Sequence, residues 1–187
     1  CSFRSLNFVA DPANVLDQSA TRRITKKRGV HDRLEGKTMK TNIGLLLTKR
    51  AHLNPEREAY VESDGSRRFT FKELNDRSNR LANGLLASGL QKGDRVGLLS
   101  MNSVEFMESF FAIAKAGGVV VPLNWRLVAD ELEFILKDSG VQTLIFDNEF
   151  AETVADLEGR GDKTEINHWL HVLGGASEHA CQPFAVS

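Results

Sequence analysis

The chain has 187 residues, of which 41% are hydrophobic and 26% charged, a composition typical of one soluble globular domain rather than a disordered or fibrous protein. Its formal net charge of −1 gives no overall field that would favour nucleic acid or an anionic membrane. No apolar run approaches the roughly 20 residues of a transmembrane helix. The two cysteines, Cys1 and Cys181, are too far apart in the sequence to suggest a disulfide framework, so we expect a cytoplasmic protein.

The positive charge is concentrated in residues 1–38. They contain eight Lys and Arg against four Asp and Glu, a balance of +4 that leaves −5 for residues 39–187. No helical or strand period runs through them, and the most basic part, residues 21–28, contains no aromatic side chain. A nucleic-acid patch, a transit peptide and a lipoprotein beginning at Cys1 are weaker interpretations than a poorly ordered leader outside the fold. Met39, just ahead of the first regular pattern, is a candidate natural start.

A helix and a β-hairpin are predicted at the start of the patterned region. Ile43, Leu46 and Leu47 fall at helical spacing, and Asn54-Pro55 ends this helix because proline cannot donate the next hydrogen bond. Residues 58–63 and 66–70 are typical of short strands. They are joined at Asp64-Gly65, a pair that favours a tight turn with positive φ.

A second helix is predicted directly after the hairpin. Thr70 followed by Glu73 is the signature of a capping box, which satisfies free N–H groups at a helix start. Leu74, Leu81 and Leu85 supply a buried stripe, and Gly89 ends the helix.

Strands and helices then alternate. Short apolar strands are predicted at residues 95–100, 119–123 and 143–146. Ser103 is the expected N-cap of a helix that runs to Lys115 and ends at Gly117-Gly118. Because this helix is apolar on most sides, we expect it to be buried on both flanks. A further helix is predicted over Ala129–Ser139, ended by Gly140.

This alternation predicts an α/β fold with a mostly parallel sheet flanked by helices on both faces. The signal is weaker after Phe150. Residues 151–157 favour one more helix, and residues 166–173 favour either a short helix or a strand.

A search for reactive motifs assigns no catalytic, cofactor-binding or metal residue. The sequence contains no G-x-G-x-x-G dinucleotide fingerprint and no G-x-S-x-G nucleophile elbow. Residues 159–164 superficially resemble a phosphate loop. Asp162 separates the glycine from the lysine, however, and the glycine required five positions earlier is absent, so we expect a solvated turn.

Two further groups of side chains also favour ordinary structural roles. His168, His171, His179 and Cys181 are metal-ligand residue types, but their spacing matches no zinc pattern, although His168 and His171 could share a helix face. The carboxylates are expected at solvent-facing helix positions, with no pair singled out for acid–base chemistry. The phenylalanines of residues 104–114 are expected in the core rather than around a pocket.

Residues 69–147 resemble the N-terminal lobe of the adenylate-forming ligases, the AMP-binding family of acyl-CoA synthetases. The resemblance is carried by segments that occur in the family's order, and it extends more weakly over residues 43–156. These segments are residues 69–74, 78–82, 89–96, 102–106, 116–124, 131–132 and 138–139. Residues 39–187 are accordingly expected to form an incomplete N-terminal AMP-binding domain.

The resemblance implies a ligase that joins a carboxylic acid, such as a fatty acid, to ATP and then passes the acyl group to coenzyme A. Members of the family use a Ser/Thr/Gly-rich loop with a lysine, an acidic residue for Mg²⁺, an aspartate for the ribose and a lysine from a mobile C-terminal domain. None of these can be placed in this sequence, which ends before the phosphate loop is expected. We therefore predict that this polypeptide has no ligase activity by itself.

Three hypotheses stay open from the sequence. The first is an N-terminal piece of an ATP-dependent acyl-CoA ligase. The second is a non-enzymatic α/β scaffold or regulatory module derived from that lobe. The third is a general nucleotide-binding regulator, for which this sequence lacks the expected glycine fingerprint. The identity of the acid and the oligomeric state cannot be read from the sequence. A sheet separated from its partners is expected to leave an unpaired edge and to be marginally soluble.

Overall fold

A five-stranded sheet organises the described part of the chain, which is residues 42–161, 163–172 and 182–183 of a computed structural model. The strands lie in the order β4 (Val119–Pro122), β3 (Arg95–Leu99), β5 (Thr143–Asp147), β6 (His168–Val172) and β7 (Gln182–Pro183). The first four strands are parallel, and β7 pairs antiparallel with β6. The predicted mostly parallel α/β fold is therefore confirmed, and the expected leader, residues 1–38, lies outside the described residues.

Alternate side chains of β3 and β5 enter two separate hydrophobic cores. Val96 and Ile145 belong to the core on one face of the sheet, and Leu99 and Phe146 belong to the core on the other. This alternation follows from the two-residue repeat of a strand. All four side chains are inaccessible to solvent, as expected for a sheet covered on both faces.

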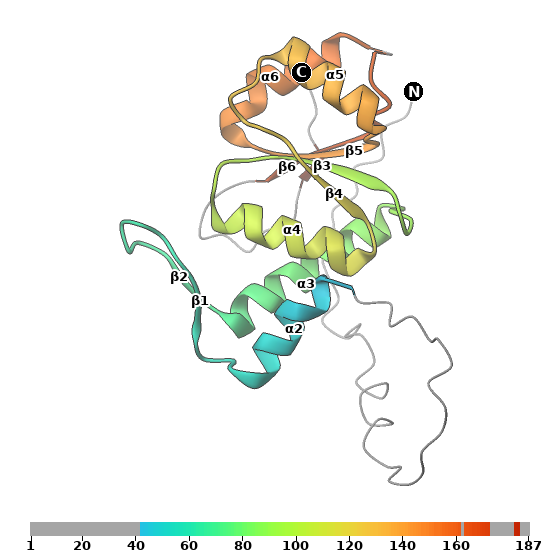
Figure 1. Cartoon of the computed structure of the whole chain (residues 1–187). Coiled ribbons are helices and arrows are strands. Elements are labelled where there is room, and N and C mark those ends of the chain that lie inside the picture. Colours follow the sequence, from blue (N-terminus) through green and yellow to red (C-terminus); the bar gives the residue numbers. More distant parts are fainter. Residues whose placement is uncertain (1–41, 162, 173–181, 184–187) are drawn as a thin grey trace, which may run out of the picture. The chain divides into compact units, whose positions relative to one another are not determined.

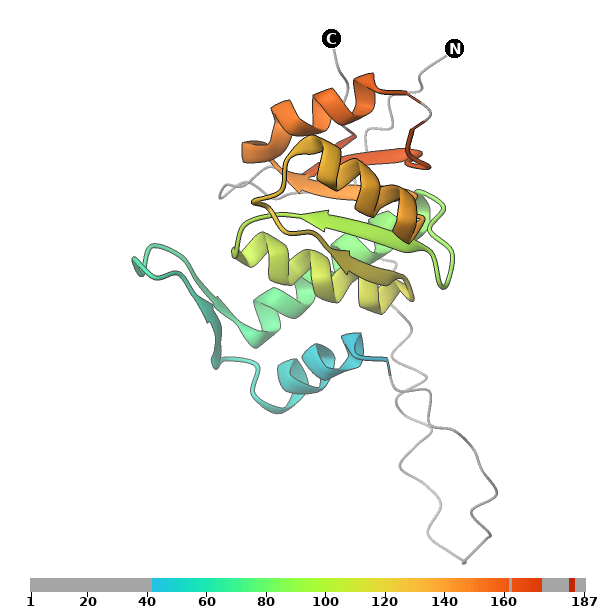
Figure 2. The same cartoon turned by 45° about the horizontal axis from the view of Figure 1, so that its top comes forward.

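Each face of the sheet has its own helices (Figure 1). Helices α5 (Ala129–Ser139) and α6 (Ala151–Gly159) cover one face, and α3 (Phe71–Ala87) and α4 (Val104–Ala116) cover the other. Figure 2 shows α4 between the sheet and the helix α2 (Gly44–Leu53). The expectation that α4 is buried on both flanks is confirmed.

A second layer covers α3 and α4 on the side away from the sheet. It consists of α2 (Gly44–Leu53) and the antiparallel hairpin of β1 (Glu58–Val61) and β2 (Arg68–Thr70). A third core cluster lies beneath this layer and includes Leu47, Leu74 and Val104.

The hairpin differs from the prediction in length. Its strands are shorter than residues 58–63 and 66–70. The loop between them is correspondingly longer and is closed by a hydrogen bond from Glu62 N–H to the Arg67 carbonyl. Asp64 and Gly65 do form the turn, since the Asp64 carboxylate accepts from Ser66 N–H and Gly65 has a φ of +71°.

The predicted helix ends are confirmed. Thr70 and Glu73 form a reciprocal capping box at the start of α3. The Ser103 hydroxyl accepts from Phe106 N–H at 3.1 Å to cap α4. Gly117 and Gly140 end α4 and α5 with φ values of +86° and +61°, a conformation that side-chain-bearing residues resist.

The region left open by the sequence, residues 166–173, contains strand β6. His168 and His171 therefore do not share a helix face, because residues three apart in a strand point to opposite sides of the sheet. A 3₁₀ turn, η1 (Asn148–Phe150), precedes α6. Within the described ranges, no helix is long and apolar enough to cross a membrane.

Candidate functional site

The carboxyl edge of the sheet between β3 and β5 is the place where an open α/β sheet commonly binds ligands. From β3 the chain passes through α4 to β4 on one side, and then through α5 to β5 on the other side of β3. The chain connections therefore diverge at β3 and β5, and this topological switch point is where open α/β sheets commonly bind ligands.

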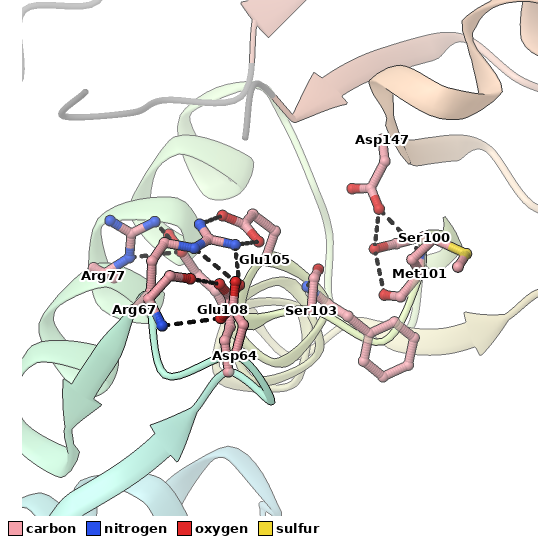
Figure 3. Close-up of polar contacts among 12 residues, drawn as sticks. Asp64, Arg67, Arg77, Ser100, Met101, Ser103, Glu105, Glu108 and Asp147 are labelled. Carbon is pink, nitrogen blue, oxygen red and sulfur yellow. Dashed lines mark hydrogen bonds and ion pairs between the residues drawn. The ribbon is translucent and has the colours of Figure 1, made fainter. Parts of the chain in front are cut away.

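A buried hydrogen-bonded pair joins the two strands at this edge. The Ser100 hydroxyl, just after β3, donates to Asp147 Oδ2 at 2.6 Å, and Met101 N–H donates to the same oxygen at 3.0 Å (Figure 3). Burial raises the pKa of the Asp147 carboxyl, and these two hydrogen bonds partly offset the effect. The Ser100 hydroxyl also lies 3.0 Å from the Met101 carbonyl oxygen. The Ser100–Asp147 pair therefore joins β5 to the loop before α4.

Two glutamates on α4 form ion pairs with the surrounding elements. Glu105 Oε1 lies 2.5 Å from a terminal nitrogen of Arg67, and the same guanidinium bonds Glu62 in the hairpin. Glu108 Oε2 lies 2.8 Å from Arg77 of α3. Figure 3 shows both pairs at the N-terminal part of α4.

The expectation that the carboxylates occupy solvent-facing helix positions is wrong for these two glutamates. Glu105 and Glu108 are each 6% exposed, because α4 is covered by the hairpin and α3 as well as by the sheet. Burial raises the pKa of Glu108, whereas Arg77 lowers it. Nothing in the local sequence marks these glutamates as buried, since their partners lie 38 and 31 positions away.

A third polar contact joins α2, α3 and α4. Lys115 Nζ donates to the side-chain oxygens of Asn75 and Asn79 at 2.6 and 2.7 Å, and the Thr48 hydroxyl donates to Asn75. Burial lowers the pKa of Lys115 to about 8. The lysine is thus held by neutral amides, which ties the outer helix to the inner pair.

A surface hollow of about 250 Å³ lies beside α3 and is lined by Phe69, Glu73, Asp76, Arg77 and Arg80. Most of its charged groups already have intramolecular partners. Glu73 accepts from Thr70, Asp76 from Lys72, and Arg77 pairs with Glu108. The charge of Arg80 also acts on Glu108 and lowers its pKa. The hollow therefore gives little basis for binding a ligand.

Of the candidate metal-ligand residues, the structure describes only His168 and His171, which point to opposite sides of the sheet. His171 stacks on Phe146 with ring centroids 5.2 Å apart, and no group of three metal-ligand side chains occurs within the part of the chain that the structure describes. His179 and Cys181 lie outside the described residues. Residues 159–161 end α6, and the described residues after them lead into β6 and not into a helix N-terminus that could bind phosphate.

The described loops at the carboxyl edge, which follow β3, β4 and β5, carry little that suits a nucleoside triphosphate or its metal ion. Residues 100–103, 123–128 and 147–150 contain no glycine and one cation, Arg126, which stacks on Trp125 at 4.7 Å. The Asp147 carboxylate is already engaged by Ser100 and Met101. These loops can form part of the rim of a binding site. We assign none of their residues to ATP, Mg²⁺ or coenzyme A.

Comparisons with known proteins identify the family to which this α/β fold belongs. A family model described as "AMP-binding enzyme" matches residues 47–183. Over 130 residues the chain is 44% identical to the long-chain-fatty-acid–CoA ligase FadD13 of Mycobacterium tuberculosis, a match that covers 69% of this chain and 26% of that protein. Over 115 residues it is 44% identical to feruloyl-CoA synthase from an Amycolatopsis species, with 62% of this chain and 23% of that protein covered.

Solved structures give the same result. The inhibitor-bound N-terminal domain of FACL13 from Mycobacterium tuberculosis superposes with a TM-score of 0.67 and 41% identity, covering 70% of this chain and 33% of that one. The chain spans about a quarter of the length of the curated relatives it matches. Since the family model covers well over half of its residues, the protein belongs to the AMP-binding enzyme family, within which it matches the N-terminal part of adenylate-forming acyl-CoA ligases.

Proposed function

We propose that this chain is the N-terminal portion of a cytoplasmic ATP-dependent acyl-CoA ligase. The complete enzyme would activate a carboxylic acid, such as a fatty acid, as an acyl-adenylate and transfer it to coenzyme A. The observation that supports this most directly is the family-model match over residues 47–183, together with 44% identity to a protein named as a long-chain-fatty-acid–CoA ligase.

In this proposal the chain contributes scaffold and not chemistry. Adenylation requires the triphosphate and the carboxylate to be held together while negative charge on the transferring group is neutralised. The described loops offer Arg126 alone as a cation at the carboxyl edge of the sheet. The role of this segment is thus to hold strands β3 and β5 and the loops after them in position for residues outside this sequence.

A chimera tests the scaffold role. The matching segment of Mycobacterium tuberculosis FadD13 is replaced by this chain's residues 47–172, and coenzyme A- and ATP-dependent consumption of a long-chain fatty acid is measured. We expect activity within about tenfold of the parent enzyme, which corresponds to about 1.4 kcal/mol of transition-state stabilisation. A chimera that also carries Leu98→Asp, which buries a charge in the core, is the inactive control.

A second experiment tests the expected inactivity of the isolated chain. ATP–pyrophosphate exchange is measured with the purified 187-residue chain over a panel of carboxylic acids. Turnover above background would refute the proposal that the catalytic groups lie elsewhere. Sequencing the transcript beyond Ser187 separates the ligase from the scaffold hypothesis, because a stop codon there would favour the non-enzymatic module.

A further inference from the structure

The β1–β2 hairpin depends on the rest of the chain for its order. Within the described part of the chain, β1 and β2 form a two-stranded sheet of their own, separate from the five-stranded sheet (Figure 1). A two-stranded hairpin alone is at best marginally stable in water. Contacts with α3 and α4 must therefore supply what holds this hairpin in place.

The apolar side of these contacts is only partly enclosed. Every residue of β1 and β2 remains exposed or half-buried, whereas four of the five residues of β5 are buried. Ala59, Tyr60 and Phe69 pack, half-buried, against the third core cluster. Because stabilisation by apolar contact scales with the area removed from water, the hairpin gains less from packing than β5 does.

Backbone hydrogen bonds fasten the base of the hairpin, where it meets α3. Phe71 N–H donates to the Arg57 carbonyl at 2.9 Å, and Lys72 N–H donates to the Pro55 carbonyl at 3.1 Å. The loop of residues 62–67 lies at the opposite end of the two strands. A contact made from that loop therefore has the greatest leverage over the position of the hairpin.

Arg67 makes such a contact with the first turn of α4. Its terminal nitrogens donate to both carboxylate oxygens of Glu105, at 2.5 and 3.3 Å, and its Nε donates to Glu62 at 2.9 Å (Figure 3). Bidentate pairs of this kind are among the strongest hydrogen-bonded contacts in proteins. Because Glu105 is buried, a closed hairpin without Arg67 would cover a charge that has lost its counter-ion.

A second arginine acts nearer the middle of β2. The Arg77 guanidinium lies 5.2 Å from the centre of the Phe69 ring and pairs with Glu108 on α4 at 2.8 Å. Arg77 belongs to α3, so it holds Phe69 only through the face of the ring, an interaction of modest strength. Among the described residues, the ion pair that joins the hairpin directly to α4 is Arg67–Glu105.

We propose that the β1–β2 hairpin is a strap that opens as one unit about its base while the five-stranded sheet stays folded, and that the Arg67–Glu105 ion pair is the lock that holds it closed. Local opening of this kind belongs to elements with few buried apolar contacts. Opening returns the guanidinium and the Glu105 carboxylate to water together. The inference is independent of the proposed ligase function, since it rests on the contacts of the hairpin alone.

Native-state hydrogen exchange of the 187-residue chain, followed amide by amide in urea below the unfolding transition, tests the separate opening. We expect the hydrogen-bonded amides of β1 and β2 to exchange at least about tenfold faster than those of β3 and β5, relative to their intrinsic rates. Equal protection of the two sets would overturn the strap.

A substitution in the opposite core separates local opening from global unfolding. Leu136 is fully buried on α5, on the other face of the sheet from the hairpin. Leu136→Ala should speed exchange in β3 and β5 at least about 30-fold, because these amides exchange through global unfolding. The hairpin amides should stay within about twofold of the wild type. Equal acceleration of both sets would show that the hairpin opens only when the whole chain unfolds.

Arg67→Met tests the lock. It should speed exchange of the hairpin amides by about tenfold or more, because the closed state then covers an unpaired carboxylate. Sheet exchange should rise by the same factor, since both openings start from the closed state. Arg68→Met is the matched control. It breaks the pair with Glu58, in which both side chains are more than half exposed, and should change exchange by less than about twofold.

Glu105→Gln removes the charge from the other side of the lock and keeps the shape of the side chain. It should also speed exchange of the hairpin amides, and it tests the lock even if Arg67→Met does not fold. Acceleration by Arg67→Met without any by Glu105→Gln would assign the lock to the Arg67–Glu62 pair and overturn the proposed one. Equal behaviour of Arg67→Met and Arg68→Met would overturn it as well.

Discussion

The two faces of the parallel sheet are covered in different ways. On one face α5 and α6 form a single layer over an apolar core, and no polar residue of these two helices is classed as buried. On the other face α3 and α4 are themselves covered by α2 and the hairpin. Among the described residues, five of the seven buried polar side chains lie on α3 or α4 and none lies on α5 or α6. They are Asn75, Ser78, Glu105, Glu108 and Ser109.

This difference shows how layering changes what a helix must contain. A helix in a single outer layer can direct its charges outward, so its sequence is amphipathic and easy to interpret. A helix covered on both sides has no such direction, and each of its charges requires a partner within the protein. The inner helix α4 is therefore predicted to respond to substitution and pH in ways that α5 and α6 do not.

The largest effect is expected in the apolar core beneath the single layer. Phe146 is fully buried, so Phe146→Ala should lower the free energy of unfolding by about 3–5 kcal/mol through lost burial and the cavity left behind. Urea unfolding of the chain measures it. Phe134→Ala, at a position 70% exposed on α5, is the control and should change stability by less than about 0.5 kcal/mol. Equal effects of the two substitutions would contradict the core described for this face.

The next largest effect is expected for the buried ion pair of the double layer. Arg77→Met should lower the free energy of unfolding by about 3 kcal/mol at neutral pH, because it leaves the Glu108 carboxylate buried without a counter-charge. The loss should be smaller in mildly acidic buffer, since burial already raises the pKa of Glu108 and a protonated carboxyl needs no cation.

The double variant Arg77→Met/Glu108→Leu is the control for this pair. Removing both charges from an enclosed position should restore most of the lost stability. If the double variant is as unstable as Arg77→Met, then packing of the arginine on Phe69, where its guanidinium lies 5.2 Å from the ring centroid, accounts for the loss instead.

A pH-dependent effect is expected at Lys115. Because burial lowers its pKa from 10.5 to about 8, the unfolded chain retains a proton that the folded chain has lost between these values. Stability contributed by this group therefore rises with pH across that window. Lys115→Met should abolish the rise. At neutral pH it should cost about 1 kcal/mol by leaving the Asn79 oxygen without its donor, while the Asn75 oxygen keeps the Thr48 hydroxyl. An unchanged pH dependence in urea titrations would show that Lys115 is solvated.

The smallest effect is expected at the sheet edge. In Asp147→Asn the amide oxygen can still accept from Ser100 and Met101, so stability at neutral pH should change by less than about 1 kcal/mol. Burial raises the pKa of Asp147, so its contribution to stability is present at low pH and is lost as pH rises through that raised value. The variant should lack this loss. A large destabilisation would show that the loop requires the ionised carboxylate. Asp147→Ala provides the comparison, because it removes the acceptor of Met101 N–H and leaves the Ser100 hydroxyl only the Met101 carbonyl.

Most elements could be predicted because their signals are local. The capping box of Thr70 and Glu73, the Ser103 cap and the glycine at position 140 each act within four residues, and α5 begins and ends where predicted. The hairpin was predicted with strands that are too long, because its pairing depends on contacts that no short sequence pattern encodes. Strand β6 could not be separated from a helix by periodicity alone, since it takes its state from pairing with β5.

The sequence by itself determined the α/β class, the alternation of strands and helices, and the family, because caps, turns and apolar spacing are properties of neighbouring residues. Only the tertiary structure decided the strand order and the burial of Glu105 and Glu108. It also decided which side of α2 faces outward. These features arise from contacts between segments tens of residues apart, where a side chain's surroundings, and not its own chemistry, set whether it meets water, an ion partner or apolar neighbours.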